Sequence, residues 1–185
     1  MSSAGSVGDD DRLRLFLALQ VPDPTLDVLE RWRDHQLACG RALARDALHV
    51  TLAFLGSRPA RELAAIVDVL REAAAGSGTP VLEPAAWRET RSVGMVVLQD
   101  HGSEAAALAG RVHEGLAGLG VYEPETRPWL PHVTMLRFRQ RPRLAPPLPE
   151  TGTFVPSGAA AYLSRLHPSG ARYEVLERVS LNAGG

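Results

Sequence analysis

The chain contains the tripeptide His-Val-Thr twice, each time at the start of an apolar run. The first copy opens the segment HVTLAFLG at His49, and the second opens HVTMLRFR at His132. Both runs are rich in β-branched and apolar residues, so each is predicted to be a β-strand. Residues i and i+2 of a strand lie on the same face. Each copy therefore presents a histidine and a threonine side by side, with a valine on the opposite face.

The rest of the chain alternates predicted strands and helices around these two motifs. Strands are predicted at 12–22, 49–55, 79–87, 92–99 and 132–138, and helices at 25–38, 59–76 and 102–120. Ser103 is predicted to cap the third helix. Residues 140–150 contain four prolines and are predicted to be a loop, and residues 158–181 a hairpin with its turn at Pro-Ser-Gly. This order, with an HVT strand in each half, suggests an internal duplication.

The chain has 185 residues and no lysine, so all 20 of its basic residues are arginines. A covalent lysyl-nucleotide, a Schiff base and the phosphate-binding lysine of nucleotide-binding loops are therefore all excluded. A net charge of −1 argues against extensive binding along a nucleic-acid backbone. Any bound anion must be held by arginine, histidine, hydroxyl groups or backbone N–H groups.

The acidic N-terminal segment, residues 1–11, is predicted to be a disordered tail, followed by one domain over residues 12–181. Nothing at the N-terminus has the pattern of a secretory signal, and no apolar run is long enough to cross a membrane. Cys39 is the single cysteine, which excludes an intrachain disulfide. We therefore expect a cytoplasmic location without membrane association, and a monomer.

Two HVT strands brought face to face would place two imidazoles and two hydroxyls in one site. One neutral histidine would take a proton from water, and the other, protonated, would give a proton to a leaving alkoxide. The hydroxyls of Thr51 and Thr134 would donate to phosphate oxygens, so the set suits phosphodiester hydrolysis. A metal site would need a third ligand at suitable spacing, which neither motif supplies, so no metal is expected.

The remaining candidates are less specific. Simple alternation places Arg137 on the face opposite His132, although a bulge would reverse that placement. Arg139 and Arg141 offer further positive charge at the end of the same strand. Trp129 is predicted either to pack in the core or to stack on a base. The other four histidines are interpreted as surface or packing residues, and they are His35, His101, His113 and His167.

The segments HVTLAFLG and PHVTMLRFR, with RLFLAL near the start and ARYEVLERVSL near the end, resemble the two-histidine (2H) phosphoesterase superfamily. The most similar branch is that of the RNA 2′,3′-cyclic phosphodiesterases, often labelled 2′-5′ RNA ligases. The resemblance implies a bilobal α+β fold, with two antiparallel sheets related by a pseudo-two-fold axis around a central groove and helices on the outside. It also implies no metal or other cofactor.

By the same resemblance, the partner is an RNA with a 2′,3′-cyclic phosphate end, which is opened to a 2′-phosphomonoester. His49 would be the proton donor to the 3′-oxygen and His132 the proton acceptor that activates water, while Thr51, Thr134 and Arg137 would hold the phosphate. Joining of RNA through a 2′-5′ linkage would be the reverse reaction. The alternatives are a cyclic phosphodiesterase acting on a small nucleotide, such as ADP-ribose 1″,2″-cyclic phosphate, and a non-catalytic protein that binds RNA ends.

Overall fold

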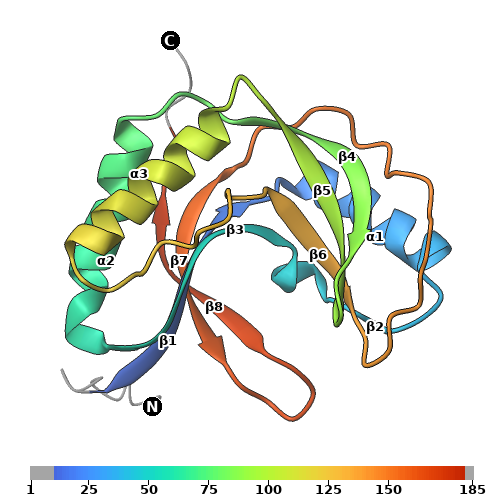
Figure 1. Ribbon diagram of the computed structural model, residues 1–185, viewed down its shortest axis with the longest axis horizontal. Coiled ribbons are helices and arrows are strands. Elements are labelled where there is room, and N and C mark those ends of the chain that lie inside the picture. The colour runs from blue at the N-terminus through green and yellow to red at the C-terminus, as the bar shows by residue number, and fades with distance from the viewer. Residues whose placement is uncertain (1–10, 182–185) are drawn as a thin grey trace, which may run out of the picture.

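The computed structural model describes residues 11–181, which fold into three α-helices and eight β-strands (Figure 1). The predicted α+β class is confirmed, while all but the last residue of the predicted tail lies outside the described residues. The strands are β1 (Arg12–Gln20), β2 (Arg41–Ala42), β3 (His49–Pro59), β4 (Val81–Glu89), β5 (Val93–His101), β6 (His132–Arg137), β7 (Gly158–Arg165) and β8 (Arg172–Val179). The helices are α1 (Asp23–Gln36), α2 (Leu63–Ala75) and α3 (Glu104–Gly118), with short 3₁₀ turns η1 (Arg45–Ala47) and η2 (Ala60–Glu62).

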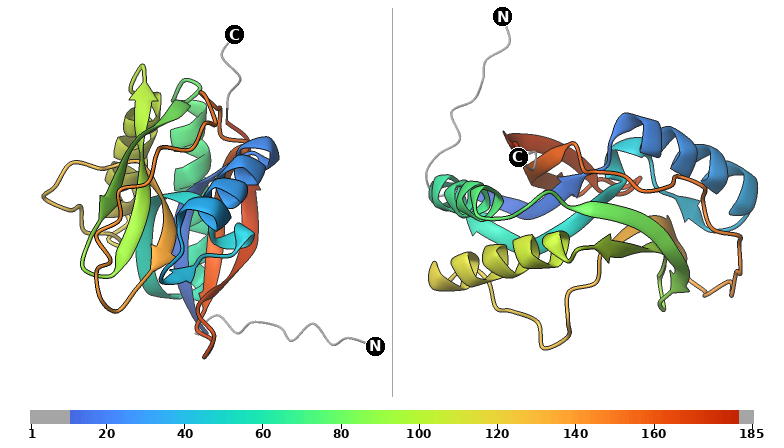
Figure 2. Two further views of the ribbon diagram at one scale, coloured as in Figure 1. Left: turned by 90° about the vertical axis from the view of Figure 1, so that its right-hand side faces the viewer. Right: turned by 90° about the horizontal axis from the view of Figure 1, so that it is seen from above.

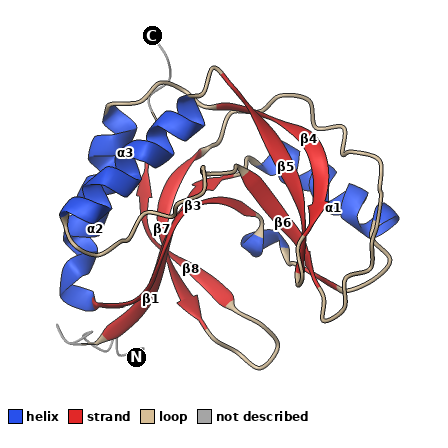
Figure 3. Cartoon of the chain, in the orientation of Figure 1, coloured by secondary structure: helices blue, strands red, loops and turns tan. Residues whose placement is uncertain are grey.

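The strands form two antiparallel groups that meet at a single residue pair. The order along the sheet is β4-β5-β6-β3-β1-β7-β8, with the short β2 also paired to β6 (Figure 3). Between β6 and β3, the pairing consists of Val50 opposite Val133. The two predicted sheets are therefore joined into one path at this point. Because β3 and β6 run antiparallel there, a local two-fold axis relates the two HVT motifs.

The helices flank the strands at two ends of the molecule. Helices α2 and α3 lie side by side at one end, and α1 lies at the other (Figure 2). The two neighbouring helices approach closely at Gly115, where an added Cβ would come within 2.6 Å of Val69. In the described part of the chain, no helix has both the length and the apolar character that a membrane crossing requires.

Two local predictions need correction. Strand β3 does not end near Gly56 but continues to Pro59, because its last residues pair with the start of β1 at Arg12. Ser103 stands at the N-cap position of α3, as predicted, but it has a φ of 62° and its side chain makes no cap hydrogen bond. The carboxylate of Asp100 accepts hydrogen bonds from the first turn of the helix instead.

The proline-rich segment 140–150 forms the predicted loop and is fastened to the fold at both of its ends. At the far end, the indole Nε1–H of Trp32 on α1 donates to the carbonyl of Pro147 over 2.7 Å. The Trp32 ring also packs on Trp87 of β4, with ring centroids 5.8 Å apart. Through Trp32, the loop is therefore attached both to α1 and, by way of Trp87, to β4.

The near end of the loop is held by the carboxylate of Glu89, whose side chain is 1% exposed. It accepts hydrogen bonds from the N–H groups of Leu144 at 2.7 Å and Arg143 at 2.9 Å, and from Arg141 Nε at 3.2 Å. Burial alone would raise the pKa of Glu89, but these donors and a tryptophan N–H outweigh it and hold the pKa below its ordinary value. The carboxylate therefore stays charged, and its contribution to stability is lost only as the pH falls through this lowered pKa.

Replacing Glu89 with alanine is expected to lower the free energy of unfolding by about 3 kcal/mol, because two backbone N–H groups lose their buried acceptor. The measurement is a urea titration at neutral pH. Glu150→Ala is the matched control, since this exposed carboxylate lies at the end of the same loop, and its effect should be within about 0.5 kcal/mol. Equal effects of the two substitutions would show that Glu89 does not hold the loop.

Candidate active site

The pairing of β3 with β6 brings the two HVT motifs together. Val50 and Val133 face the core and are almost fully buried. The residues on either side of each valine lie on the opposite face, where all four line one cavity of about 380 Å³, called here the histidine cavity. These four are His49, Thr51, His132 and Thr134. Strand periodicity places each histidine and threonine on one face, and the local two-fold axis brings the two pairs into a single site.

Arg137 also lines the histidine cavity, because β6 contains a bulge. Consecutive residues of β5 pair with Thr134 and Leu136, which leaves Met135 as an extra residue in β6. The bulge reverses the alternation, so that Met135 and Leu136 are both buried and Arg137 returns to the face of His132. The placement of Arg137 by simple alternation is therefore wrong. Two successive apolar residues before an arginine are the only trace of the bulge in the sequence.

The same irregularity occurs in β3. Consecutive residues of β1 pair with Thr51 and Ala53, so Leu52 is the extra residue. Phe54 is the last residue of HVTLAF, and it therefore occupies the position that corresponds to Arg137 in HVTMLR. Phe54 is 49% exposed, and the guanidinium of Arg14 lies over its ring, 4.9 Å from the ring centroid. The local symmetry thus places an aromatic ring on one side of the cavity and a cation on the other.

In each bulge, the carbonyl of the extra residue accepts a hydrogen bond. His113 on α3 lies with Nε2 2.7 Å from the carbonyl oxygen of Leu52, and since a carbonyl can only accept, Nε2 carries the proton. The carbonyl of Met135 accepts from the backbone N–H of Leu43 over 3.0 Å. His113 also stacks on Tyr122, with centroids 4.9 Å apart. It is a packing residue, as predicted, but one that supports the backbone of the site.

The short segment between Pro128 and Pro131 is hydrogen-bonded to both motifs. The indole Nε1–H of Trp129 donates to the carbonyl of Thr51 over 3.0 Å, and the ring packs against the core. The next carbonyl, that of Leu130, lies 2.8 Å from Nδ1 of His132, which must donate to it. In the neutral imidazole of His132, Nε2 therefore carries the free lone pair and is able to accept a proton.

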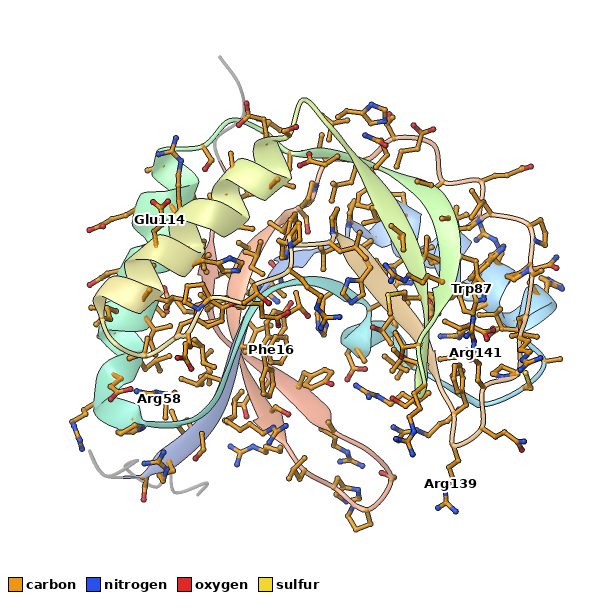
Figure 4. The ribbon with its side chains drawn as sticks, in the orientation of Figure 1. Phe16, Arg58, Trp87, Glu114, Arg139 and Arg141 are labelled. Atoms are coloured by element: carbon orange, nitrogen blue, oxygen red, sulfur yellow. The ribbon has the colours of Figure 1, made fainter. Side chains whose placement is uncertain are left out.

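The ring of His49 is surrounded by aromatic side chains. Its centroid is 4.8 Å from that of Phe16 and 5.5 and 5.8 Å from those of Tyr173 and Tyr162 (Figure 4 labels Phe16 between the strands). Its Nδ1 is buried and has no hydrogen-bond partner among the described residues. With no acceptor for a proton at Nδ1, the neutral ring keeps its proton on Nε2.

The protonation of His49 is set by the same surroundings. Burial, together with smaller contributions from His132 and Arg137, lowers its pKa to about 4. In the absence of a bound anion, the ring is therefore neutral near pH 7. An anion between the two histidines would favour the protonated ring and raise this pKa.

The histidine cavity is built for an anion. Arg14, Arg41 and Arg137 line it, and no aspartate or glutamate does so among residues 11–181. Arg139 and Arg141, which the sequence offered as additional charge, do not line it: Arg139 projects away from the molecule (Figure 4) and Arg141 is bonded to Glu89. Within the described residues there is also no group of three or more histidine, cysteine, aspartate or glutamate side chains close enough to hold a metal ion.

Comparisons with known proteins agree with this geometry. The sequence model of the 2′-5′ RNA ligase superfamily matches residues 21–167. The RNA 2′,3′-cyclic phosphodiesterase of Escherichia coli (strain K12) is 28% identical over 171 residues, which cover 91% of this chain and 96% of that protein. The crystal structure of TT0787 of Thermus thermophilus has a TM-score of 0.78 at 28% identity, covering 92% of this chain and 99% of its own. E. coli LigT in its apo form has a TM-score of 0.79 at 25% identity, covering 92% and 98%.

Proposed function

The chain belongs to the 2′-5′ RNA ligase superfamily, and from this premise we propose that it opens RNA 2′,3′-cyclic phosphate ends to 2′-phosphomonoesters. The observation that carries the proposal is one arginine-lined cavity into which two histidines project with different hydrogen-bond surroundings. The homology to an RNA 2′,3′-cyclic phosphodiesterase supports phosphoesterase activity in general. The cyclic RNA end as the substrate is the proposed refinement.

The two histidines take opposite roles in this proposal. His132 accepts a proton from water, and its Nδ1–H bond to Leu130 supports this role by leaving the Nε2 lone pair free. His49 gives a proton from Nε2 to the departing 3′-oxygen, and its lack of any acceptor at Nδ1 is consistent with a proton on Nε2. The motifs are identical as tripeptides, so the support for this division comes from what surrounds each ring.

The phosphate is held by uncharged and charged donors together. The hydroxyls of Thr51 and Thr134 and the guanidinium of Arg137 line the same cavity as the histidines and are proposed to bind the non-bridging oxygens. Negative charge builds on these oxygens as the entering oxygen attacks phosphorus. Fixed donors directed at them therefore stabilise the transition state more than the ground state.

The pH dependence is expected to differ between kcat/KM and kcat. The pKa of His49 should appear in kcat/KM at about pH 4, because kcat/KM reports the free protein and the pKa of His49 there is about 4. His49 must be protonated to act as the acid, and its protonated fraction falls as the pH rises through this pKa, which produces a basic limb. In kcat the limb should lie at higher pH, because the bound anion raises the pKa of His49. Initial rates across the acidic and neutral range test this, and limbs at the same pH in both parameters would contradict it.

The direct test of the proposed function uses an RNA that ends in a 2′,3′-cyclic phosphate, with EDTA present. Conversion to the 2′-phosphomonoester without loss of rate in EDTA is the expected result. An unchanged cyclic end, or activity abolished by EDTA, would overturn the proposal. Faster turnover of ADP-ribose 1″,2″-cyclic phosphate than of RNA would assign the site to a small nucleotide, and tight RNA binding without turnover would assign it to recognition alone.

A further inference from the structure

A small apolar group packs beside the histidine cavity, apart from the main core. Its aromatic members are Phe16, Tyr162 and Tyr173, called here the ring cluster. Phe16 of β1 and Tyr162 of β7 are partners across the two strands, and their rings stack with centroids 4.8 Å apart and an angle of 3° between their planes. The ring of Tyr173, on β8, stands at 77° to that of Phe16. Three different strands thus bring aromatic rings to one wall of the cavity.

The imidazole of His49 is packed against this wall in two directions. Phe16 lies 4.8 Å away with its plane at 30° to the imidazole, so the two rings are closer to parallel than to perpendicular. Tyr173 lies 5.5 Å away with its plane at 79°, nearly perpendicular. Rotation of the imidazole about either of its side-chain torsions would therefore bring it against one of these two rings.

The two histidines of the site are held in different ways. Nδ1 of His132 donates to the carbonyl of Leu130, and a hydrogen bond at the second ring nitrogen is the usual means of fixing an imidazole. Nδ1 of His49 has no such bond to any residue that the structure describes. The orientation of His49 therefore depends on packing, and the ring cluster supplies that packing.

We propose that Phe16 and Tyr173 are positioning residues for the proton donor, an inference that rests on the proposed function. They hold the imidazole of His49 so that Nε2 is directed at the leaving 3′-oxygen, the task that the carbonyl of Leu130 performs for His132. Proton transfer requires close alignment of donor and acceptor, and a misplacement of about 1 Å can cost a factor of about 10² in rate. Removal of a ring that fixes the donor should therefore slow the chemical step.

The ring cluster also suits the charge that His49 carries as a proton donor. The face of an aromatic ring attracts a cation, and the attraction is stronger where water is excluded. A carboxylate would stabilise the imidazolium as well, but it would repel the phosphate, and no carboxylate of the described chain lines the cavity. Aromatic faces therefore stabilise the protonated ring without opposing the binding of an anionic substrate.

Phe16 and Tyr173 differ in how firmly they are embedded. Phe16 is 3% exposed and is stacked on Tyr162, whose hydroxyl accepts a hydrogen bond from Nε2 of Gln20 over 3.3 Å. Tyr173 lies near the start of β8 and is half-buried. Phe16→Leu is therefore the substitution with the larger expected effect on His49, and Tyr173→Leu is the one that disturbs the fold less.

The test compares two RNAs with cyclic ends, one with the natural 3′-oxygen and one with sulfur in its place, in single-turnover reactions. Because a thiolate leaves without a proton, the sulfur substrate does not need an aligned donor. Phe16→Leu should open the oxygen substrate about tenfold more slowly than the wild type, and the sulfur substrate within about twofold of the wild-type rate. Tyr173→Leu should show the same pattern with a smaller loss. Phe154→Leu, at a buried phenylalanine outside the histidine cavity, is the matched control and should change neither rate.

A double variant shows whether Phe16 acts through His49. In His49→Ala the proton donor is already absent, so the addition of Phe16→Leu should not slow the oxygen substrate further. A residue that only supports the fold, or that contacts the substrate directly, would instead add its own loss in this background. Urea titrations of each variant show that the rates are measured on folded protein.

The outcomes separate this inference from the function on which it rests. Equal slowing of both substrates by Phe16→Leu, a normal rate with the oxygen substrate, or a further loss in the double variant would overturn the positioning role and leave the proposed function standing. If Phe16→Leu does not fold, Tyr173→Leu decides the question by the same comparison. No opening of the cyclic end by the wild type, or a normal rate in His49→Ala, would instead overturn the proposed function.

Discussion

Replacing His132 with alanine is expected to lower kcat for opening a 2′,3′-cyclic RNA end by a factor of about 10²–10⁴, because the attacking water loses its proton acceptor. Replacing His49 should cost a similar factor, because the 3′-oxygen would leave without a proton. Single-turnover rates with an end-labelled RNA measure both effects on the chemical step. His101→Ala is the control, since this exposed histidine pairs with Glu83 outside the histidine cavity.

Substitution of His49 also needs a variant that keeps the aromatic packing. His49→Gln preserves a side chain of similar length among Phe16 and the two tyrosines, while removing the group that gives the proton. We expect it to be as slow as the alanine variant, with an unfolding free energy closer to that of the wild type. Near-normal turnover in either His49 variant, or in His132→Ala, would remove that histidine from the reaction.

Arg137→Ala is expected to lower kcat about 10²-fold, because the guanidinium faces oxygens on which charge builds in the transition state. Arg137→Lys should recover only part of the loss, since an ammonium group cannot bind two oxygens as a planar fork does. The matched control is Arg139→Ala, two residues further along the chain, where the side chain projects away from the molecule (Figure 4). This control should retain nearly full activity.

The activities of these three variants together test whether the bulge in β6 directs Arg137 into the histidine cavity. If the bulge at Met135 directs Arg137 into the histidine cavity, the loss should be confined to position 137. Equal losses at positions 137 and 139 would indicate a general effect of positive charge. Full activity in Arg137→Ala would show that the phosphate is held without this guanidinium.

Strand periodicity was sufficient to predict which side chains share a face, and long apolar runs were sufficient to predict most elements. His49 and Thr51 share the cavity face as the i, i+2 rule requires, as do His132 and Thr134. Periodicity does not show which strand pairs with which. The pairing of Val50 with Val133, which turns two separate motifs into one site, follows from how the whole chain packs.

The two bulges could not be predicted from the alternation of side chains along a strand. A bulge is defined by the register between two strands, so it cannot be found in one strand alone. The buried pairs Leu52–Ala53 and Met135–Leu136 are its only local signs, and such pairs also occur in fully buried strands. A second cavity of about 500 Å³, next to the histidine cavity, was also missed, because its walls come from β3, β4, α3 and the segment before β6, which are far apart in the sequence.

The division of roles between the two histidines could not be predicted from the motifs themselves, for a different reason. Identical tripeptides have identical intrinsic chemistry, so any difference must come from their neighbours. For His132 that neighbour is the carbonyl of Leu130, close in the chain. For His49 it is a group of aromatic rings, of which Tyr162 and Tyr173 belong to the C-terminal hairpin.

The central claim is that His49 protonates the 3′-oxygen while His132 deprotonates the entering water, and a substrate with sulfur in place of that 3′-oxygen tests it most directly. A thiolate leaves without a proton, so the substitution removes the need for a general acid and leaves the need for a base. The measurement is the rate of ring opening of the oxygen and sulfur substrates by His49→Ala and His132→Ala. We predict that sulfur restores His49→Ala to near the wild-type rate and leaves His132→Ala slow. Rescue of His132→Ala instead, or no rescue of either variant, would contradict the account.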